Sequence, residues 1–155
     1  MDAPSDDFAP MLNAARDGWC TAMDLRFVRA TRDEVVAEWT VGPQHLQAYG
    51  IVHGGVHSGV VETLASVGAA LDVMPHGRSA VGLENHTSFL HAVRGGTLRA
   101  VARPLSRGRR TQVWEVTVAD ESGRAVAVGR VRMLCLDEGA RVAGEDVAIK
   151  TAPTE

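Results

Sequence analysis

The stretch between residues 47 and 66 contains the side chains and glycines of this sequence that are best placed to bind an anion. His53, Gly54 and Gly55 stand where a loop is expected to become a helix. Glycine lets a ligand approach the backbone closely, and the first N–H groups of a helix are unpaired at the positive end of its dipole. Such a helix start can stabilise an oxyanion. Glu62 follows His53 by nine residues, about two and a half turns.

A helix over residues 54–71 is expected to position these groups. Its larger apolar residues recur every three or four positions and form one stripe, made of Val56, Val60, Leu64, Val67 and Leu71. Glu62 and Ser66 lie one turn apart on the side away from this stripe. From the residues alone, that side is either a catalytic surface or simply the solvent-exposed face.

The rest of the chain predicts an antiparallel sheet. A short helix over residues 5–17 comes first, capped by Ser5, split or shortened by Pro10 and ended by Gly18. Strand patterns with turn residues between them follow at 23–30, 34–41, 79–93, 97–106, 110–119 and 124–137. A run of strands after a long helix indicates an α+β fold. One helix cannot cover every face of such a sheet, so we expect self-association.

The length of 155 residues favours one folded domain. We place an N-terminal helical segment at residues 1–22 and the main domain at residues 23–137. Residues 138–155 are polar and show no periodicity, so we expect a flexible tail.

Composition excludes several classes of function. The net charge of −3 argues against nucleic acid as a partner, and no apolar run reaches the ~18 residues of a membrane span. The acidic start of the chain does not fit a secretory signal, so a cytoplasmic location is expected. Cys20 and Cys135 form neither a disulfide framework nor a metal-binding motif. Lys150 is the sole lysine, which argues against lysine-based covalent catalysis.

Residues 47–66 and 81–137 resemble the hotdog-fold acyl-CoA thioesterases. The branch they resemble contains the phenylacetate-pathway, 4-hydroxybenzoyl-CoA and dihydroxynaphthoyl-CoA thioesterases. The matching positions are Gln47, Val52-His53-Gly54-Gly55, Glu62, Ser66, Val81-Gly82, Arg94-Gly95-Gly96, Arg107-Gly108-Arg109 and Gln112-Val113-Trp114-Glu115-Val116.

This resemblance implies a sheet of about six strands wrapped around the long helix, and an active site between two subunits that pair edge to edge. It implies that the Gly54 N–H polarises the thioester carbonyl. Glu62 of the partner subunit would then attack the carbonyl or activate water. Gln47 and His53 would orient the carbonyl or the water, and Ser66 would hold the carboxylate or the water. Dimers that pair into tetramers are expected, with no cofactor other than coenzyme A as part of the substrate.

Further residues are candidates for substrate binding. We predict contacts from Gly55 and Thr63, which adjoin the catalytic residues, and from His86, which could line a pocket or be an ordinary hydrogen-bonded sheet histidine. Arg107, Arg109 and Arg110 either grip the phosphates of coenzyme A or form a solvated turn.

Four other possibilities stand beside catalysis by Glu62 alone. His53 and His57 have the spacing of a helical metal pair, but no third ligand accompanies them, so no metal site is predicted. Asp72 and Glu84 could pair with Glu62, although surface acids are the default. A non-catalytic acyl-CoA-binding module with the same fold is another alternative, and the presence of Glu62 argues against it because such a module needs no catalytic carboxylate. A hotdog hydratase or dehydratase carries an Asp and His pair in a different motif.

Overall fold

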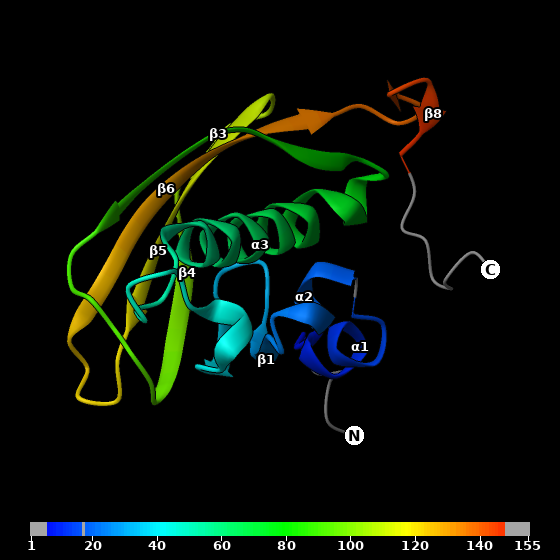
Figure 1. Cartoon of the computed structure of the whole chain (residues 1–155). Helices are drawn as coiled ribbons and strands as arrows, with labels where there is room; N and C mark the ends of the chain where they lie inside the picture. Colours follow the sequence, from blue (N-terminus) through cyan, green and yellow to red (C-terminus); the bar gives the residue numbers. More distant parts are fainter. Residues whose placement is uncertain (1–5, 17, 148–155) are drawn as a thin grey trace.

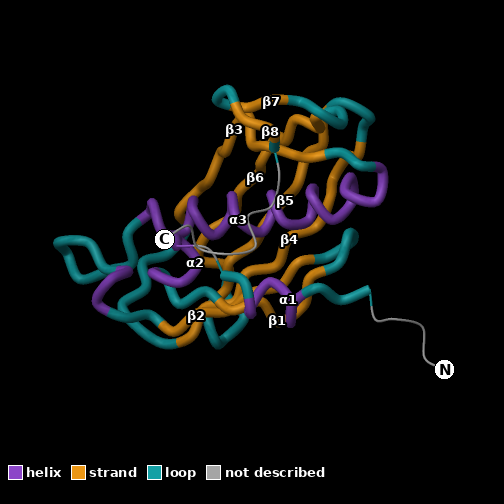
Figure 2. The backbone as a smooth tube through the Cα atoms, turned by 90° about the vertical axis from the view of Figure 1, so that its right-hand side faces the viewer, coloured by secondary structure: helices purple, strands orange, loops and turns teal. Residues whose placement is uncertain are grey.

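A computed structural model of the chain describes residues 6–16 and 18–147. A six-stranded antiparallel sheet curves around one long helix, α3 (Gly54–Val73) (Figure 1). Figure 2 shows α3 lying across the sheet, with the strands passing behind it. The predicted α+β class and the single central helix are therefore confirmed. None of the described helices is both long and apolar enough to span a membrane.

The six strands lie in the order β1-β2-β4-β5-β6-β3. Their bounds are β1 (Arg26–Ala30), β2 (Val35–Thr40), β3 (Ser79–Phe89), β4 (Thr97–Arg107), β5 (Thr111–Ala119) and β6 (Ala125–Leu136). The first predicted strand began too early, because Asp24 has a positive φ of 47° and belongs to a turn. The third ran too far, because the chain leaves the sheet after Phe89 and forms a loop before β4.

The core lies between α3 and the concave face of the sheet. Inward residues alternate along β5, where Trp114, Val116 and Val118 are fully buried, and α3 contributes Val60 and Leu64. The indole of Trp114 passes so close to Gly68 of α3 that a Cβ there would lie 2.4 Å from the ring. The small residues of α3 therefore allow the sheet to approach the helix closely.

The N-terminal segment forms two short helices, α1 (Ala9–Ala14) and α2 (Gly18–Ala22), instead of the one predicted over residues 5–17. Pro10 lies in the first turn of α1, where a missing N–H costs no helical bond. Asp7 accepts a hydrogen bond from the Ala9 N–H at 3.0 Å, and the predicted cap Ser5 lies outside the described residues. The prediction that Gly18 ends a helix is wrong, because Gly18 begins α2.

The two edges of the sheet differ. Beside β1, the Asp7 carboxylate accepts from the Ala30 N–H at 2.8 Å, and Asn13 exchanges two hydrogen bonds with the backbone of Phe27. At the other edge, the outer side of β3 makes no backbone hydrogen bond to any residue in the described ranges. The edge at β1 is thus covered, whereas the edge at β3 is open.

A small hairpin follows the sheet, formed by β7 (Arg141–Val142) and β8 (Glu145–Asp146). The expectation of no regular element after residue 137 is wrong for this part. Ala143 and Gly144, the two residues between these strands, both have positive φ, which is the geometry of a tight hairpin turn. Residues 148–155 lie outside the described part of the chain. Two 3₁₀ turns complete the structure, η1 (Pro43–His45) and η2 (Met74–His76).

Candidate functional site

The start of α3 presents one free backbone donor. His53 is the N-cap residue, and its Nδ1 accepts a hydrogen bond from the Gly55 N–H at 2.8 Å. The preceding N–H, that of Gly54, makes no hydrogen bond to any residue that the structure describes. Because Nδ1 of His53 is an acceptor, the neutral ring carries its proton on Nε2. The helix start therefore offers the Gly54 N–H, and next to it the Nε2–H of His53.

Gly55 serves this cap. A Cβ on Gly55 would lie 2.9 Å from Nδ1 of His53, so the contact between them requires a residue without a side chain. Gly55 was predicted to contact substrate, but its N–H is already used by His53. Gly54 is the residue that keeps an available N–H.

A cavity of about 330 Å³ opens beside Gly54. It is lined by Gln47, Ile51, Val52, Gly54, His57, Phe89, Leu90, His91 and Ala92. Most of these side chains are apolar, while Gln47, His57 and His91 supply the polar atoms. The combination of an apolar wall with few polar groups is typical of a small-molecule site.

Gln47 reaches this cavity from a closed loop. Its backbone N–H donates to the Ile51 carbonyl at 2.9 Å, and its carbonyl accepts from the Gly50 N–H at 2.8 Å. The loop needs the positive φ of 70° that Gly50 adopts. The side-chain Oε1 of Gln47 accepts from the Tyr49 N–H, which leaves the amide NH₂ as the group available to a ligand.

The carboxylate of Glu62 is held in place further along α3. Oε2 accepts a hydrogen bond from Nδ2 of Asn85 at 3.0 Å, and Oε1 accepts from Oγ of Ser66 at 3.5 Å. Oε1 also lies against bare backbone, since a Cβ on Gly82 would be 2.1 Å away from it. Ser66 therefore contacts Glu62 as the spacing predicted, and β3 supplies the other contacts.

The structure does not bring Gly54 and Glu62 together within one chain. They are eight residues apart on a continuous helix, which places them about 12 Å apart along its axis. Thr63, predicted to contact substrate, uses its hydroxyl to donate to the Gly59 carbonyl at 2.8 Å. His86 is exposed on β3 and does not line the cavity beside Gly54.

Several residues at the site were missed by sequence reasoning. Asn85 orients Glu62 and also donates to the Ser58 carbonyl at 3.0 Å. Phe89 covers Gly54, because a Cβ on Gly54 would meet its ring at 2.8 Å. A glycine inside a strand pattern, as at Gly82, was an available signal of close approach. Phe89 stood out only as one of three strand aromatics, with Trp39 and Trp114, that could line an acyl pocket, and nothing in the sequence marked Asn85.

His57 was considered only as a possible metal ligand. It is 3% exposed, and its imidazole contacts the rings of Trp39 and Phe89 at centroid distances of 6.5 and 6.2 Å. Its Nδ1 is buried without a hydrogen-bond partner. Burial lowers the pKa of His57 to about 4, so the ring is neutral at pH 7. Within the described ranges, no three His, Cys, Asp or Glu residues are arranged to hold a metal ion.

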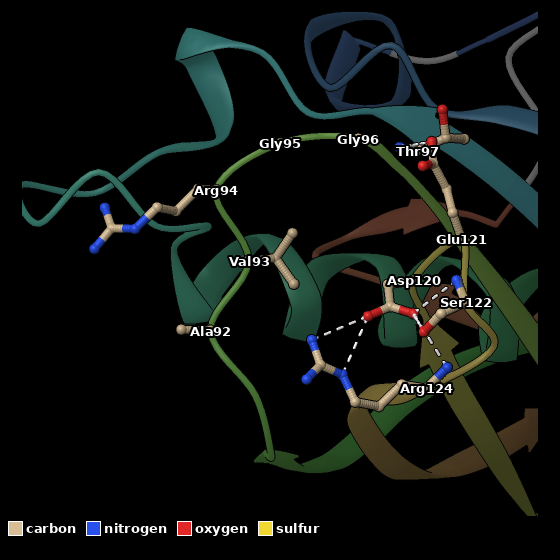
Figure 3. Close-up of a pocket in the computed structure, with 10 residues that line it drawn as sticks. All are labelled: Ala92, Val93, Arg94, Gly95, Gly96, Thr97, Asp120, Glu121, Ser122 and Arg124. Atoms are coloured by element: carbon tan, nitrogen blue, oxygen red, sulfur yellow. Dashed lines mark hydrogen bonds and ion pairs between the residues drawn. The ribbon is translucent and has the colours of Figure 1, made fainter.

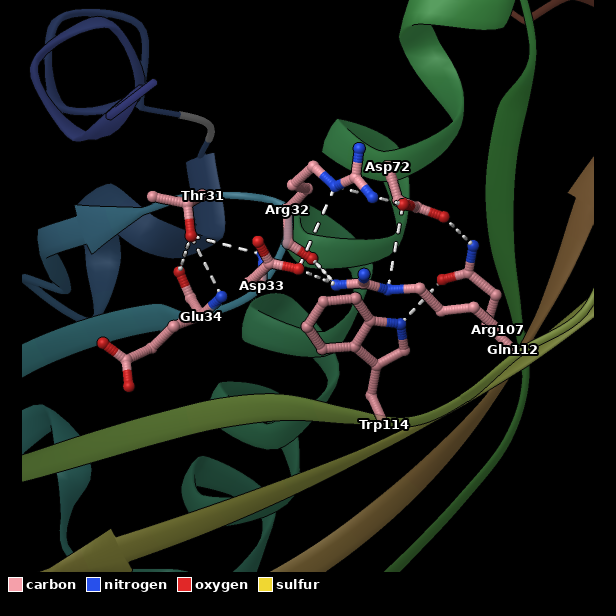
Figure 4. A network of polar contacts seen from close by, with 8 residues as sticks. All are labelled: Thr31, Arg32, Asp33, Glu34, Asp72, Arg107, Gln112 and Trp114. Atoms are coloured by element: carbon pink, nitrogen blue, oxygen red, sulfur yellow. Dashed lines mark hydrogen bonds and ion pairs between the residues drawn. The ribbon is translucent and has the colours of Figure 1, made fainter. Parts of the chain in front are cut away.

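The three arginines at the β4–β5 turn have different surroundings, and Figure 4 shows those of Arg107. Arg107 points inward: its Nη2 lies 2.9 Å from Asp33, its Nε lies 3.7 Å from Asp72, and its guanidinium stacks on Trp114. Arg109 and Arg110 are exposed and have no side-chain partner among the described residues. Arg107 is therefore not part of a solvated turn, while contact of the three arginines with the phosphates of coenzyme A stays a prediction.

Asp72 anchors the same network at the end of α3. Its side chain is 17% exposed, and its Oδ2 accepts from Nε2 of the buried Gln112 at 2.8 Å. The Oε1 of Gln112 in turn accepts from the indole N–H of Trp114 at 2.8 Å. The default assignment of Asp72 as a surface acid is thus wrong, because it neutralises Arg107 beneath the turn. Glu84 on β3 pairs with Arg132 on β6 at 3.0 Å and does not pair with Glu62.

A second cavity, of about 400 Å³, lies between the β3–β4 loop and the β5–β6 turn (Figure 3). Its charged groups are occupied by one another: Arg124 pairs with Asp120 at 3.1 Å, and Glu121 accepts from the Thr97 N–H at 2.9 Å. None of the predicted catalytic residues lines it.

Comparison with known proteins agrees with this geometry. A family model described as "Thioesterase superfamily" matches residues 49–127. The chain is 38% identical over 136 residues to "Putative esterase Rv1847" of Mycobacterium tuberculosis, covering 86% of this chain and 96% of that one. The solved structure of that protein has a TM-score of 0.77 and 37% identity, covering 81% of this chain and 100% of that one. The proofreading thioesterase EntH of Cronobacter turicensis is 33% identical over 109 residues, covering 70% and 79%.

Proposed function

Because this chain belongs to the thioesterase superfamily, as the resemblance predicted, we propose that it hydrolyses an acyl-CoA thioester to the free acid and coenzyme A. The observation that carries the proposal is the free Gly54 N–H at the start of α3, beside an apolar cavity. A thioester carbonyl becomes an oxyanion in the transition state, and a pre-aimed donor stabilises it by about 2.7–4 kcal/mol.

The residues around Gly54 have complementary tasks in this mechanism. The carbonyl oxygen accepts a hydrogen bond from the Gly54 N–H, aided by the positive end of the helix dipole. The amide NH₂ of Gln47 lines the same cavity as Gly54, and together with the Nε2–H of the adjoining His53 it would orient the carbonyl or the attacking water. The acyl group lies against the apolar wall of the cavity.

Glu62 supplies the attack by one of two routes. As a general base, its carboxylate takes a proton from water while the hydroxide adds to the carbonyl carbon. The carbon–sulfur bond then breaks, and the thiolate of coenzyme A takes up a proton. As a nucleophile, the carboxylate forms a mixed anhydride and releases the thiol, and water then hydrolyses the anhydride. Asn85 and Ser66 position the carboxylate for either route.

The two halves of this site come from two copies of the chain. Gly54 and Glu62 of one chain are too far apart to act on the same carbonyl. The open edge of β3 offers a surface on which a second β3 can pair. Phe89 of β3 is level with Gly54, and Gly82 and Asn85 are level with Glu62.

An antiparallel β3–β3 pair centred near His86 therefore brings Glu62 of one copy to the level of Gly54 of the other. The exposed Arg109 and Arg110 are then the cations available to the phosphates of coenzyme A. A pairing of two such dimers into a tetramer remains a prediction.

The proposal predicts the effect of replacing Glu62. Glu62→Gln keeps the size of the side chain and its contacts with Asn85, but it removes the base and the nucleophile. We expect kcat to fall at least a hundredfold, with acyl-CoA binding retained. Release of free thiol from a panel of straight-chain, phenylacetyl and benzoyl thioesters of coenzyme A measures the loss.

Glu38→Gln is the matched control, since Glu38 is an acid on β2, away from the β3 edge, that pairs with Arg99. Its turnover should equal that of the wild type. Unchanged turnover in Glu62→Gln would refute the role of Glu62. A wild-type protein that binds these thioesters and hydrolyses none of them would instead be an acyl-CoA-binding module.

A further inference from the structure

The cavity beside Gly54 contains a buried polar group that the proposed mechanism does not use. His57 lies three residues after Gly54 on α3, one helical turn deeper and on the same face. Its ring is 3% exposed, its Nδ1 has no partner, and neither nitrogen is hydrogen-bonded to a described residue. A buried polar group without a partner is costly, so it calls for an explanation in terms of a ligand or a function.

The surroundings of His57 do not supply that explanation. The His57 imidazole contacts the rings of Trp39 and Phe89, and Nε1 of Trp39 is likewise buried without a hydrogen-bond partner among the described residues. The remaining wall of the cavity is largely aliphatic, from Ile51, Val52, Leu90 and Ala92. An apolar side chain would fill this position without leaving an unsatisfied nitrogen, so packing alone does not account for a histidine.

We propose that His57 is a specificity-determining residue that hydrogen-bonds a neutral polar substituent, such as a hydroxyl group, on the acyl part of the substrate. The choice of ligand rests on the proposed function, because the acyl group occupies this cavity only if the thioester carbonyl binds at Gly54. A neutral imidazole carries both a donor and an acceptor, so it matches a hydroxyl, which is also both. A second carboxylate on the acyl group is disfavoured, because neither arginine nor lysine is among the described residues that line the cavity.

Turnover of matched substrates tests this proposal. The substrates are benzoyl-CoA, 3-hydroxybenzoyl-CoA and 4-hydroxybenzoyl-CoA. We expect the wild type to favour one of the hydroxylated substrates over benzoyl-CoA by about tenfold in kcat/KM, which is the worth of one hydrogen bond. His57→Leu should remove this preference, which is measured as the ratio of kcat/KM between the hydroxylated substrate and benzoyl-CoA within the same variant. His57→Gln, which keeps a neutral hydrogen-bonding group, should retain part of it.

His76→Leu is the control, because His76 is an exposed histidine in η2 at the opposite end of α3. It should leave the preference unchanged. Binding of the non-hydrolysable thioethers S-benzyl-CoA and S-(hydroxybenzyl)-CoA, measured by calorimetry, gives a readout that does not require turnover.

The outcomes separate this proposal from the proposed function. If the wild type hydrolyses none of the three thioesters, the proposed function fails, and the two thioethers still decide the role of His57. Equal binding and equal turnover of plain and hydroxylated ligands by the wild type would overturn the role of His57. A preference that survives in His57→Leu would overturn it as well. If His57→Leu does not fold, His57→Gln and His57→Ala take its place, and an undiminished preference in both of these variants would overturn the role of His57.

Discussion

Three consecutive residues at the start of α3 each have a different role in forming an anion-binding turn. His53 caps the helix and fixes its own tautomer, Gly55 makes room for the His53 ring, and Gly54 keeps a free N–H. The covering ring of Phe89 means that Gly54 is restricted as well, since any side chain there would displace the ring. Both glycines are therefore required by contacts that the structure defines.

His57 makes the stability of the protein depend on pH. Its pKa is about 4 in the folded state and 6.5 in the unfolded chain, so only the unfolded chain takes up this proton between those values. The contribution of His57 to stability is complete above pH 6.5 and is lost as the pH falls towards 4. We expect a loss of at most about 3 kcal/mol in the free energy of unfolding.

Urea unfolding at pH 7.5 and pH 4.5 measures this loss. Other groups titrate in the same interval, so the relevant quantity is the difference between the wild type and His57→Gln. The pH dependence should be smaller in His57→Gln. Identical pH dependence in the two proteins would contradict the buried, neutral state of His57.

Site residues could be predicted from the sequence where their contacts lie within one helix, and could not where the contacts join elements distant in sequence. Gly54, Glu62 and Ser66 lie on one helix with regular spacing, so the sequence alone placed Ser66 beside Glu62. Asn85 reaches Glu62 from a strand 23 residues away, and that contact depends on how β3 returns along α3. His57 lies in the apolar environment of Trp39 and Phe89, which come from two different strands. Such contacts are set by packing between elements.

At the scale of elements, α3 is tied to the sheet at its far end by a polar network. Asp72 links the helix to Arg107 on β4 and to Gln112 on β5, and Trp114 packs under the guanidinium (Figure 4). Arg107 also reaches the β1–β2 turn through Asp33 and the Arg32 carbonyl. The side chain of Arg107, which the sequence suggested could belong to a surface turn, therefore joins α3, β4, β5 and the β1–β2 turn.

This network predicts different effects for neighbouring arginines. Arg107→Ala leaves Asp72 with only the more exposed Arg32 as a cation, and removes the stacking on Trp114, so it should lower the free energy of unfolding by about 2 kcal/mol. The double variant Arg109→Ala/Arg110→Ala should leave stability unchanged and raise KM for acyl-CoA with little change in kcat. Urea unfolding and steady-state kinetics measure the two effects.

A short thioester without the nucleotide is the control, because its KM should not respond to Arg109 and Arg110. If Arg107→Ala keeps full stability and raises KM for acyl-CoA alone, Arg107 belongs to the phosphate-binding group after all.

The elements themselves were predicted best where the pattern was long. The helix α3 begins where it was expected and extends two residues beyond the expected range of 54–71, and all six expected strands are present. The N-terminal helix was misjudged because Pro10 and Gly18 have the opposite effects to those assumed: each lies in the first turn of a helix. The β7–β8 hairpin was missed because Ala143 gives no sign that it adopts a positive φ.

At the scale of the whole molecule, a shared site makes activity depend on assembly. Glu62→Gln and Gly54→Val should each be inactive, but a mixed dimer has one site with both changes and one site with neither. Random association of equal amounts then gives about a quarter of the wild-type activity. Co-expression of differently tagged chains, followed by thiol-release assays, measures the recovery.

Isolated mixed dimers with no recovered activity would show that each site is built within one chain. A protein that sediments as a monomer at micromolar concentration and still turns over acyl-CoA would contradict the shared site directly.

The open edge of β3 also affects the chain before it finds a partner. β3 is eleven residues long, contains no proline, and carries exposed Leu83 and Phe89, with Leu90 just beyond its end. An unpaired edge of this kind can template strands from any neighbouring chain, and here Glu84 is the one acid within it. A newly made chain is therefore at its most aggregation-prone in the interval between folding and pairing. During this interval the edge of β3, the strand that orients Glu62, is exposed to other chains. Rapid synthesis of this protein should therefore favour inclusion bodies unless the chains pair as fast as they are made.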